Sequence, residues 1–240
     1  MNRANARISP LRANNSHMLL IAALLLASTV PAIAQANGDL QQKLAAVKQS
    51  ATENQQKLHK YQWTETTQLN LKGDDKPPSQ SMCQYGPDEK VQKIPMSAPP
   101  PPPSGGRLKQ RVVEKKKGEM KDYMGQVKTL LAMYVPPDSQ RMQQAFQNDR
   151  AFPTGTGGIV FKDYAQPGDQ MTITFDPASK KISTVNVNTY MDDPKDIVTL
   201  AVQFATLPDG TNYVQKSVLD ATAKQLQVTT TNANYHPIAQ

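Results

Sequence analysis

The chain has 240 residues but only one cysteine, three histidines and one tryptophan. Cys83 has no second cysteine with which to form an internal disulfide, so the fold must depend on packing. His17, His59 and His236 lie too far apart in the sequence for the ligand spacing of a zinc site. The sequence also lacks paired cysteines, a nucleophile elbow and a glycine-rich phosphate loop. We therefore predict no catalytic residue, no metal, no cofactor and no enzymatic activity.

The N-terminal 34 residues have the three-part layout of a signal peptide. They contain three arginines and no acidic residue, then an apolar run from Met18 to Ala27, and then Pro31-Ala32-Ile33-Ala34. We expect cleavage after Ala34 and export to the periplasm or the extracellular space. An uncleaved membrane anchor is the alternative, although a transmembrane helix usually needs about 20 apolar residues.

Residues 35–240 are predicted to form a single α+β domain, which begins with a helix and a strand. Apolar residues recur at helical spacing over residues 39–60, and the period then changes from 3.6 to 2 over residues 61–71. Residues 81–85 and 90–96 flank Gly86-Pro87-Asp88-Glu89, which predicts a hairpin. The proline-rich residues that follow, at about 95–106, are predicted to be a flexible loop, because proline cannot join a helix or a strand ladder.

Residues 107–134 predict a helix whose two halves differ. The first half has a net charge of +5 (7 − 2), because seven basic residues face only Glu114 and Glu119. The basic residues are Arg107, Lys109, Arg111, Lys115, Lys116, Lys117 and Lys121. The second half repeats apolar residues at intervals of three and four, which indicates a core-facing helix. A shorter helix is predicted at about 138–148, with Asp138 as its N-cap.

The basic cluster has more than one interpretation. Such a run is most often a solvated helix face, but it would also attract an anionic membrane surface or another anionic partner. Export removes the chain from nucleic acid, so we predict no nucleic-acid binding. The sequence does not identify a protein partner.

The C-terminal half predicts a series of antiparallel strands, because apolar and polar residues alternate between turns rich in Asp, Pro and Gly. The strands are expected at about 158–164, 169–176, 181–190, 197–206, 211–219 and 225–232. The segment after Asp193-Pro194 also fits a helix, but its β-branched residues favour a strand. With the earlier strands, these segments predict an antiparallel sheet of about eight to nine strands, packed on the N-terminal helix and the central helix pair.

One face of the predicted sheet is apolar and is the expected site for a hydrophobic ligand. The candidates for its lining are Trp63, Met171, Ile173, Phe175, Val198, Leu200, Val202, Phe204, Leu226 and Val228. Ordinary core packing is the competing interpretation for each of these residues, because a sheet face must be covered whether or not a ligand binds.

The layout as a whole resembles a known family. Strands beginning at Tyr61-Gln62-Trp63, central helices, and a terminal series that includes residues 207–213 (Leu-Pro-Asp-Gly-Thr-Asn-Tyr) and Leu226-Gln227-Val228 resemble the periplasmic lipoprotein carriers. The resemblance implies a half-open β-barrel with an apolar concavity that takes acyl chains. We therefore expect a non-enzymatic binding protein that shelters a hydrophobic ligand such as a lipid acyl chain. The alternative is an envelope interaction module with a fully packed core and no ligand.

Overall fold

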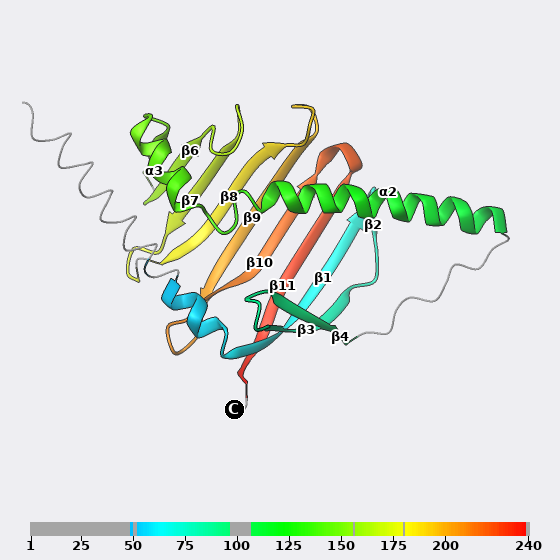
Figure 1. Ribbon diagram of the computed structural model, residues 1–240, viewed down its shortest axis with the longest axis horizontal. Helices are drawn as coiled ribbons and strands as arrows, with labels where there is room; N and C mark the ends of the chain where they lie inside the picture. The colour runs from blue at the N-terminus through cyan, green and yellow to red at the C-terminus, as the bar shows by residue number, and fades with distance from the viewer. Residues whose placement is uncertain (1–48, 50–51, 97–106, 156, 180, 239–240) are drawn as a thin grey trace, which may run out of the picture. The chain divides into compact units, whose positions relative to one another are not determined.

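The computed structural model describes residues 49, 52–96, 107–155, 157–179 and 181–238, which belong to one compact unit, Leu44–Gln240. The predicted signal peptide, most of the predicted helix at 39–60 and the predicted loop from residue 97 to 106 lie outside these residues. The described part of the first helix is residues 52–58. The fold is α+β, as predicted, with an open antiparallel sheet of 11 strands (Figure 1).

The strands follow the chain in two groups, separated by the helices α2 (Arg107–Leu131) and α3 (Ser139–Gln147). The first group is β1 (Tyr61–Leu71), β2 (Asp74–Asp75), β3 (Ser79–Tyr85) and β4 (Val91–Pro95). The second group is β5 (Ala151–Pro153), β6 (Gly158–Lys162), β7 (Gln170–Phe175), β8 (Ile182–Tyr190), β9 (Ile197–Thr206), β10 (Asn212–Ala221) and β11 (Leu226–Pro237). The nine predicted strands are present, and the two that were not predicted, β2 and β5, have only two and three residues.

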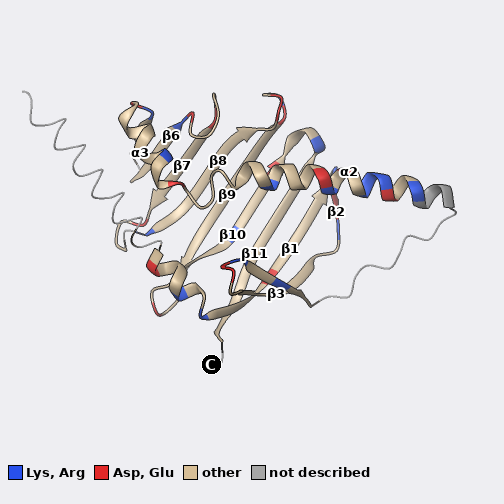
Figure 2. Cartoon of the chain, viewed as in Figure 1, with Lys and Arg blue, Asp and Glu red and all other residues tan. Residues whose placement is uncertain are grey.

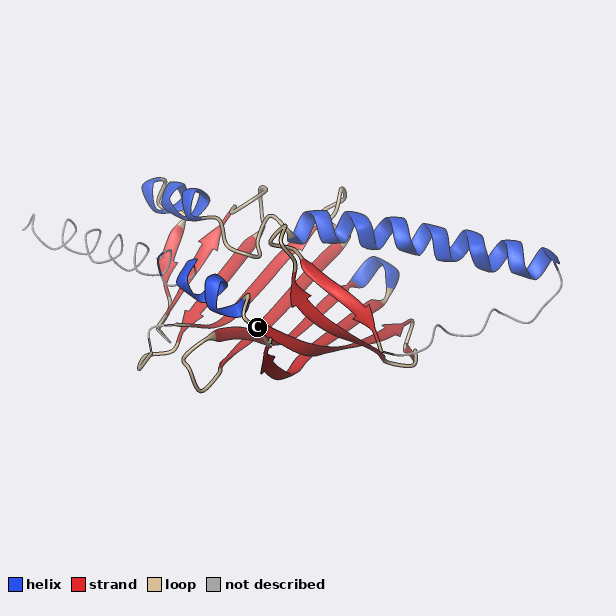
Figure 3. Cartoon of the chain, turned by 60° about the horizontal axis from the view of Figure 1, so that its bottom comes forward, coloured by secondary structure: helices blue, strands red, loops and turns tan. Residues whose placement is uncertain are grey.

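The strand order across the sheet is β4-β3-β1-β11-β10-β9-β8-β7-β6-β5, with β2 paired to β1. The first long strand, β1, thus pairs with the last, β11, from Tyr61 beside Pro237 to Leu71 beside Leu226. β4 and β5 lie at opposite edges and do not pair with each other, so the sheet is open. It is also curved (Figure 3).

The structure decides two points about local structure, at residues 197–206 and at Pro95. The segment 197–206 is the strand β9 and not a helix, because Asp193 closes a turn: its carbonyl oxygen accepts from Asp196 N at 2.8 Å. The prediction that Pro95 belongs to the loop was wrong, since Pro95 is the last residue of β4 and is in register with Ser81. β4 is an edge strand, where a missing N–H is tolerated.

The inner face of the sheet is apolar over its second group of strands. Cross-strand neighbours form a continuous row through Met171, Val187, Leu200, Leu219, Val228 and Leu69. The next row begins with Ile173, Val185 and Val202, and continues through Ser217, Thr230 and Thr67. The first row therefore stays apolar as far as β1, whereas the second row changes from apolar to polar between β9 and β10.

The second half of α2 covers the apolar part, as predicted. Tyr123, Val127 and Leu130 are buried, and so is Tyr134 just beyond the helix end. α3 begins at the predicted N-cap, where the Asp138 carboxylate accepts from Gln140 N at 2.7 Å. The first half of α2 extends away from the strands (Figure 1).

Candidate functional site

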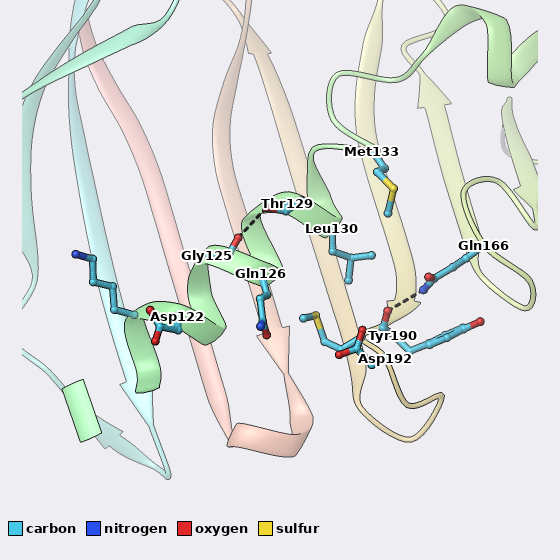
Figure 4. A pocket seen from close by; sticks show the side chains of 11 residues that line it. Asp122, Gly125, Gln126, Thr129, Leu130, Met133, Gln166, Tyr190 and Asp192 are labelled. Atoms are coloured by element: carbon cyan, nitrogen blue, oxygen red, sulfur yellow. Dashed lines mark hydrogen bonds between the residues drawn. The ribbon is translucent and has the colours of Figure 1, made fainter. Parts of the chain in front are cut away.

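A groove of about 790 Å³ lies between α2 and the connection from β8 to β9; we call it the α2 groove. Residues of α2 and of the short segment after it form one wall, and Gln166, from the loop between β6 and β7, forms the other together with residues 190–192 at and just after the end of β8 (Figure 4). The lining residues are Lys121, Asp122, Gly125, Gln126, Thr129, Leu130, Met133, Gln166, Tyr190, Met191 and Asp192. A second hollow, of about 570 Å³, shares Met133 and continues along residues 136–141.

The deep part of the α2 groove is apolar. Leu130 and Met133 line it from the helix side (Figure 4), and Tyr190 and Met191 line it from the sheet side. Thioether side chains are polarizable and adapt their shape to an apolar guest. This arrangement suits a flexible hydrocarbon chain better than a rigid polar molecule.

The rim of the groove carries polar groups without protein partners. Within the described part of the chain, the side chains of Asp122, Gln126 and Asp192 make no hydrogen bond or ion pair, and all three residues are exposed. They offer acceptors and an amide to the polar end of a ligand. The groove is thus amphipathic, with an apolar floor and a polar edge.

The sheet-side wall is held by a buried network centred on Asp169, of which only 2% is exposed. Its carboxylate accepts from the backbone N–H groups of Tyr164, Ala165 (2.9 Å) and Gln166 (2.8 Å) and from the Tyr134 hydroxyl. Gln166 in turn donates to the hydroxyl oxygen of Thr189 at 2.8 Å. Four donors on one carboxylate fix the loop that carries Gln166 and join it to the end of α2.

The helix-side wall is held by Tyr123. Its hydroxyl donates to Asp196 at 3.1 Å, in the connection after β8, and Lys224 lies 5.3 Å from its ring centroid. Burial, and then the hydrogen bond to Asp196, raise the pKa of Tyr123 to about 12. Both walls of the α2 groove are therefore anchored to the sheet by buried or half-buried polar contacts.

The residues predicted to line a ligand site share the inner face of the sheet but do not line the α2 groove. Met171, Ile173, Val198, Val202 and Leu226 are fully buried. Leu200 is buried too, whereas Phe175, Phe204 and Val228 are half-buried. The fully buried ones have almost no free surface to offer a ligand.

Trp63 lies at the other end of the inner face, within a cluster of aromatic rings. It stacks on Tyr235 with ring centroids 5.4 Å apart, and its indole N–H donates to Asn232 at 3.0 Å. Beside it, Lys93 forms an ion pair with Glu65 at 2.5 Å. The inner face of β1 and β3 therefore combines packed aromatic rings with polar and charged groups.

The basic residues predicted to contact an anionic surface lie on the first half of α2. Arg111, Lys115, Lys116, Lys117 and Lys121 are all exposed, and Lys115 is 3.9 Å from Glu119. Arg107 and Lys109 belong to the same helix, but their side chains lie outside the described residues.

Sequence reasoning missed the α2 groove and the Asp169 network. The helical spacing placed Leu130 on the core face of the helix, but the turn around Asp169 gave no sign that this carboxylate would be buried. The only available signal was an acidic residue flanked by apolar strands, which occurs equally at exposed turns.

The described residues offer neither a metal-binding cluster nor a membrane-spanning helix. They contain no group of three or more His, Cys, Asp or Glu side chains that could hold a metal ion. In the same ranges, no helix combines the length and the apolar character needed to cross a membrane.

Comparison with known proteins gave one structural likeness. No protein-family model matches the chain, and no curated protein matches it. The chain is similar to the crystal structure of a DUF1329 family protein from Desulfovibrio piger, with 8% sequence identity and a TM-score of 0.34. The similarity covers 81% of this chain and 93% of the other. A likeness at this level carries no conclusion about function.

Proposed function

We propose that this chain is an exported, non-enzymatic binding protein that holds the hydrophobic part of a lipid-like ligand in the α2 groove. The observation that supports the proposal is the amphipathic lining: Leu130, Met133 and Met191 provide an apolar floor, while Asp122 and Asp192 stand unpaired at the rim. Ligand sites are commonly concave, mostly apolar and edged by a few polar groups. The layout that resembles the periplasmic lipoprotein carriers is consistent with the same class of ligand.

The proposal differs from the sequence-based expectation in where the ligand lies. The expected site was the apolar sheet face itself, between Met171 and Val228. Most of the candidate residues on that face are buried, so a hydrocarbon chain would need to displace packed side chains there. The α2 groove, at the margin between helix and sheet, is already open.

The experiment fills the groove without disturbing the core. Gly125 lines the groove on α2, and a Cβ added there meets no heavy atom within 4 Å. Gly125→Leu should weaken binding of a fluorescent fatty acid at least tenfold, about 1.4 kcal/mol, because the new side chain occupies the ligand's space. Binding is measured by titration, and native mass spectrometry of protein from the periplasm tests for co-purified lipid.

Gly118→Leu is the matched control. Gly118 lies in the same helix with equally open space around it, but it is outside the groove. Both substitutions replace a helical glycine with a better helix former, so each should leave the fold intact or stabilise it by up to about 1 kcal/mol. Absence of co-purified lipid together with equal probe binding by both variants would refute the proposal.

A second candidate function is a protein-interaction module of the envelope, which one specific observation favours. The edge hairpin formed by β3 and β4 exposes Met82 (38%), Ile94 (52%) and Met96 (59%), and Met82 and Ile94 are cross-strand neighbours. Clustered exposed apolar residues often mark a protein contact. A photo-crosslinker at position 94 should then capture a protein that the same group at Lys216, in the central strand β10, does not.

A further inference from the structure

The first half of α2 differs from the second half in both charge and environment. Residues 111, 112 and 114–119 are exposed. This part of the helix extends beyond the edge of the sheet, whereas the second half of α2 packs on the strands (Figures 1 and 2). From residue 107 to 121 the helix has seven basic and two acidic residues, whereas from 122 to 131 it has one of each. The positive charge is therefore confined to the half that does not pack on the sheet.

The arrangement of these charges is unfavourable within the helix itself. Arg111 and Lys115 are four residues apart, so like charges lie next to each other on one ridge. The first turn contains no acidic residue, although the N-terminus of a helix favours negative charge. Within the described part of this half, a single ion pair joins Lys115 and Glu119, at 3.9 Å.

An exposed apolar residue accompanies the charges. Val112 is 56% exposed and stands between Arg111 and Val113 in the uncovered half of α2. A purely solvated helix face gains nothing from an exposed valine at this position, whereas an interface between water and lipid headgroups accommodates both apolar and basic side chains.

We propose that the basic half of α2 (residues 107–121) docks on the anionic surface of a lipid bilayer. Seven Lys and Arg residues within 15 positions fall in the range of clusters that bind anionic lipid headgroups. Phosphate groups of the headgroups supply the negative charge that the helix lacks. The contact is peripheral and electrostatic, and it does not depend on a ligand in the α2 groove.

The test is co-sedimentation of the processed chain, residues 35–240, with vesicles of phosphatidylcholine alone or mixed with phosphatidylglycerol. Binding is expected only to the mixed vesicles and should be lost at high salt, because screening weakens exposed charges. Arg111→Gln combined with Lys115→Gln should lower the partition coefficient about 25-fold, at roughly fivefold per charge. This variant removes a repulsive pair and keeps good helix formers, so it should fold.

The matched control removes the same charge elsewhere. Lys72 and Lys216 are exposed, and neither belongs to the basic half of α2. Lys72→Gln combined with Lys216→Gln should leave vesicle binding within about twofold of that of the unchanged chain, since neither lysine belongs to the half-helix that is proposed to contact the lipid headgroups. Equal losses from the two variants would mean that only net charge matters, which overturns the proposal.

Two further outcomes also overturn it. One is failure of the unchanged chain to bind mixed vesicles at low salt. The other is binding to polyglutamate that is as tight as binding to the vesicles and equally sensitive to the substitutions at Arg111 and Lys115, which would point to an acidic protein instead.

Discussion

Replacing Asp169 with asparagine is expected to destabilise the fold strongly, although the two side chains have nearly the same shape. One carboxylate oxygen of Asp169 accepts from Tyr164 N, and the other accepts from the Tyr134 hydroxyl and from Ala165 N and Gln166 N. Asparagine has only one acceptor oxygen. If that oxygen serves the larger group of donors, its NH₂ group is turned toward the Tyr164 N–H.

The expected cost follows from two buried donors left without an acceptor, the Tyr164 N–H and the new NH₂ group of the asparagine. At about 1–3 kcal/mol for each unsatisfied group, Asp169→Asn should lower the free energy of unfolding by roughly 2–6 kcal/mol. Urea unfolding followed by circular dichroism and by the fluorescence of Trp63, the single tryptophan, measures this quantity. The loop that carries Gln166 should loosen as well, so fatty-acid binding in the α2 groove should weaken.

Asp163→Asn is the matched control, because Asp163 is an exposed aspartate in the same loop. Its carboxylate accepts a single hydrogen bond, from Gly168 N at 2.6 Å, which the asparagine oxygen can keep. Its effect should stay within about 0.5 kcal/mol. If Asp169→Asn proved no more destabilising than Asp163→Asn, the network would not hold the sheet-side wall of the groove.

Three other predictions address the core and the helix anchor. The pKa of Tyr123 is raised from 10.0 to about 12, so its contribution to stability is present below pH 10 and is lost as the pH rises toward 12. Tyr123→Phe should therefore reduce the loss of unfolding free energy between pH 10 and pH 12, as measured by urea unfolding. Cys83 is fully buried, and burial raises the pKa of its thiol. A thiol reagent should therefore label Cys83 only as fast as the protein unfolds. Immediate labelling of the native protein would contradict its burial. Ile173→Ala should lower the free energy of unfolding by about 2–5 kcal/mol by opening a cavity, and should leave fatty-acid affinity unchanged. A loss of affinity without a loss of stability would indicate that the ligand binds on the sheet face.

Local sequence patterns were sufficient to predict most of the elements of this fold. Alternation of apolar and polar residues located β1 and all the longer strands of the second half, because a half-buried strand exposes every second side chain. Helical spacing separated the solvated from the core-facing half of α2, and Asp138 marked the start of α3 through its capping hydrogen bonds. The same alternation assigned the candidate lining residues to one face of the sheet.

The alternation could not show whether that face is filled or open. Both a packed core and a ligand site require apolar side chains, and the difference depends on how closely α2 approaches the sheet. Likewise, Asp169 looks like any turn aspartate until the loop folds back and surrounds it with four donors.

By itself, the sequence determined the type and approximate bounds of the helices and strands, the antiparallel α+β class and the concentration of positive charge on residues 107–121. Only the tertiary structure decided which strands pair, including β1 with β11, and where a groove remains. The physical reason is range: strand and helix periodicity comes from neighbouring residues, whereas pairing and packing join residues such as Tyr61 and Pro237 from opposite ends of the domain.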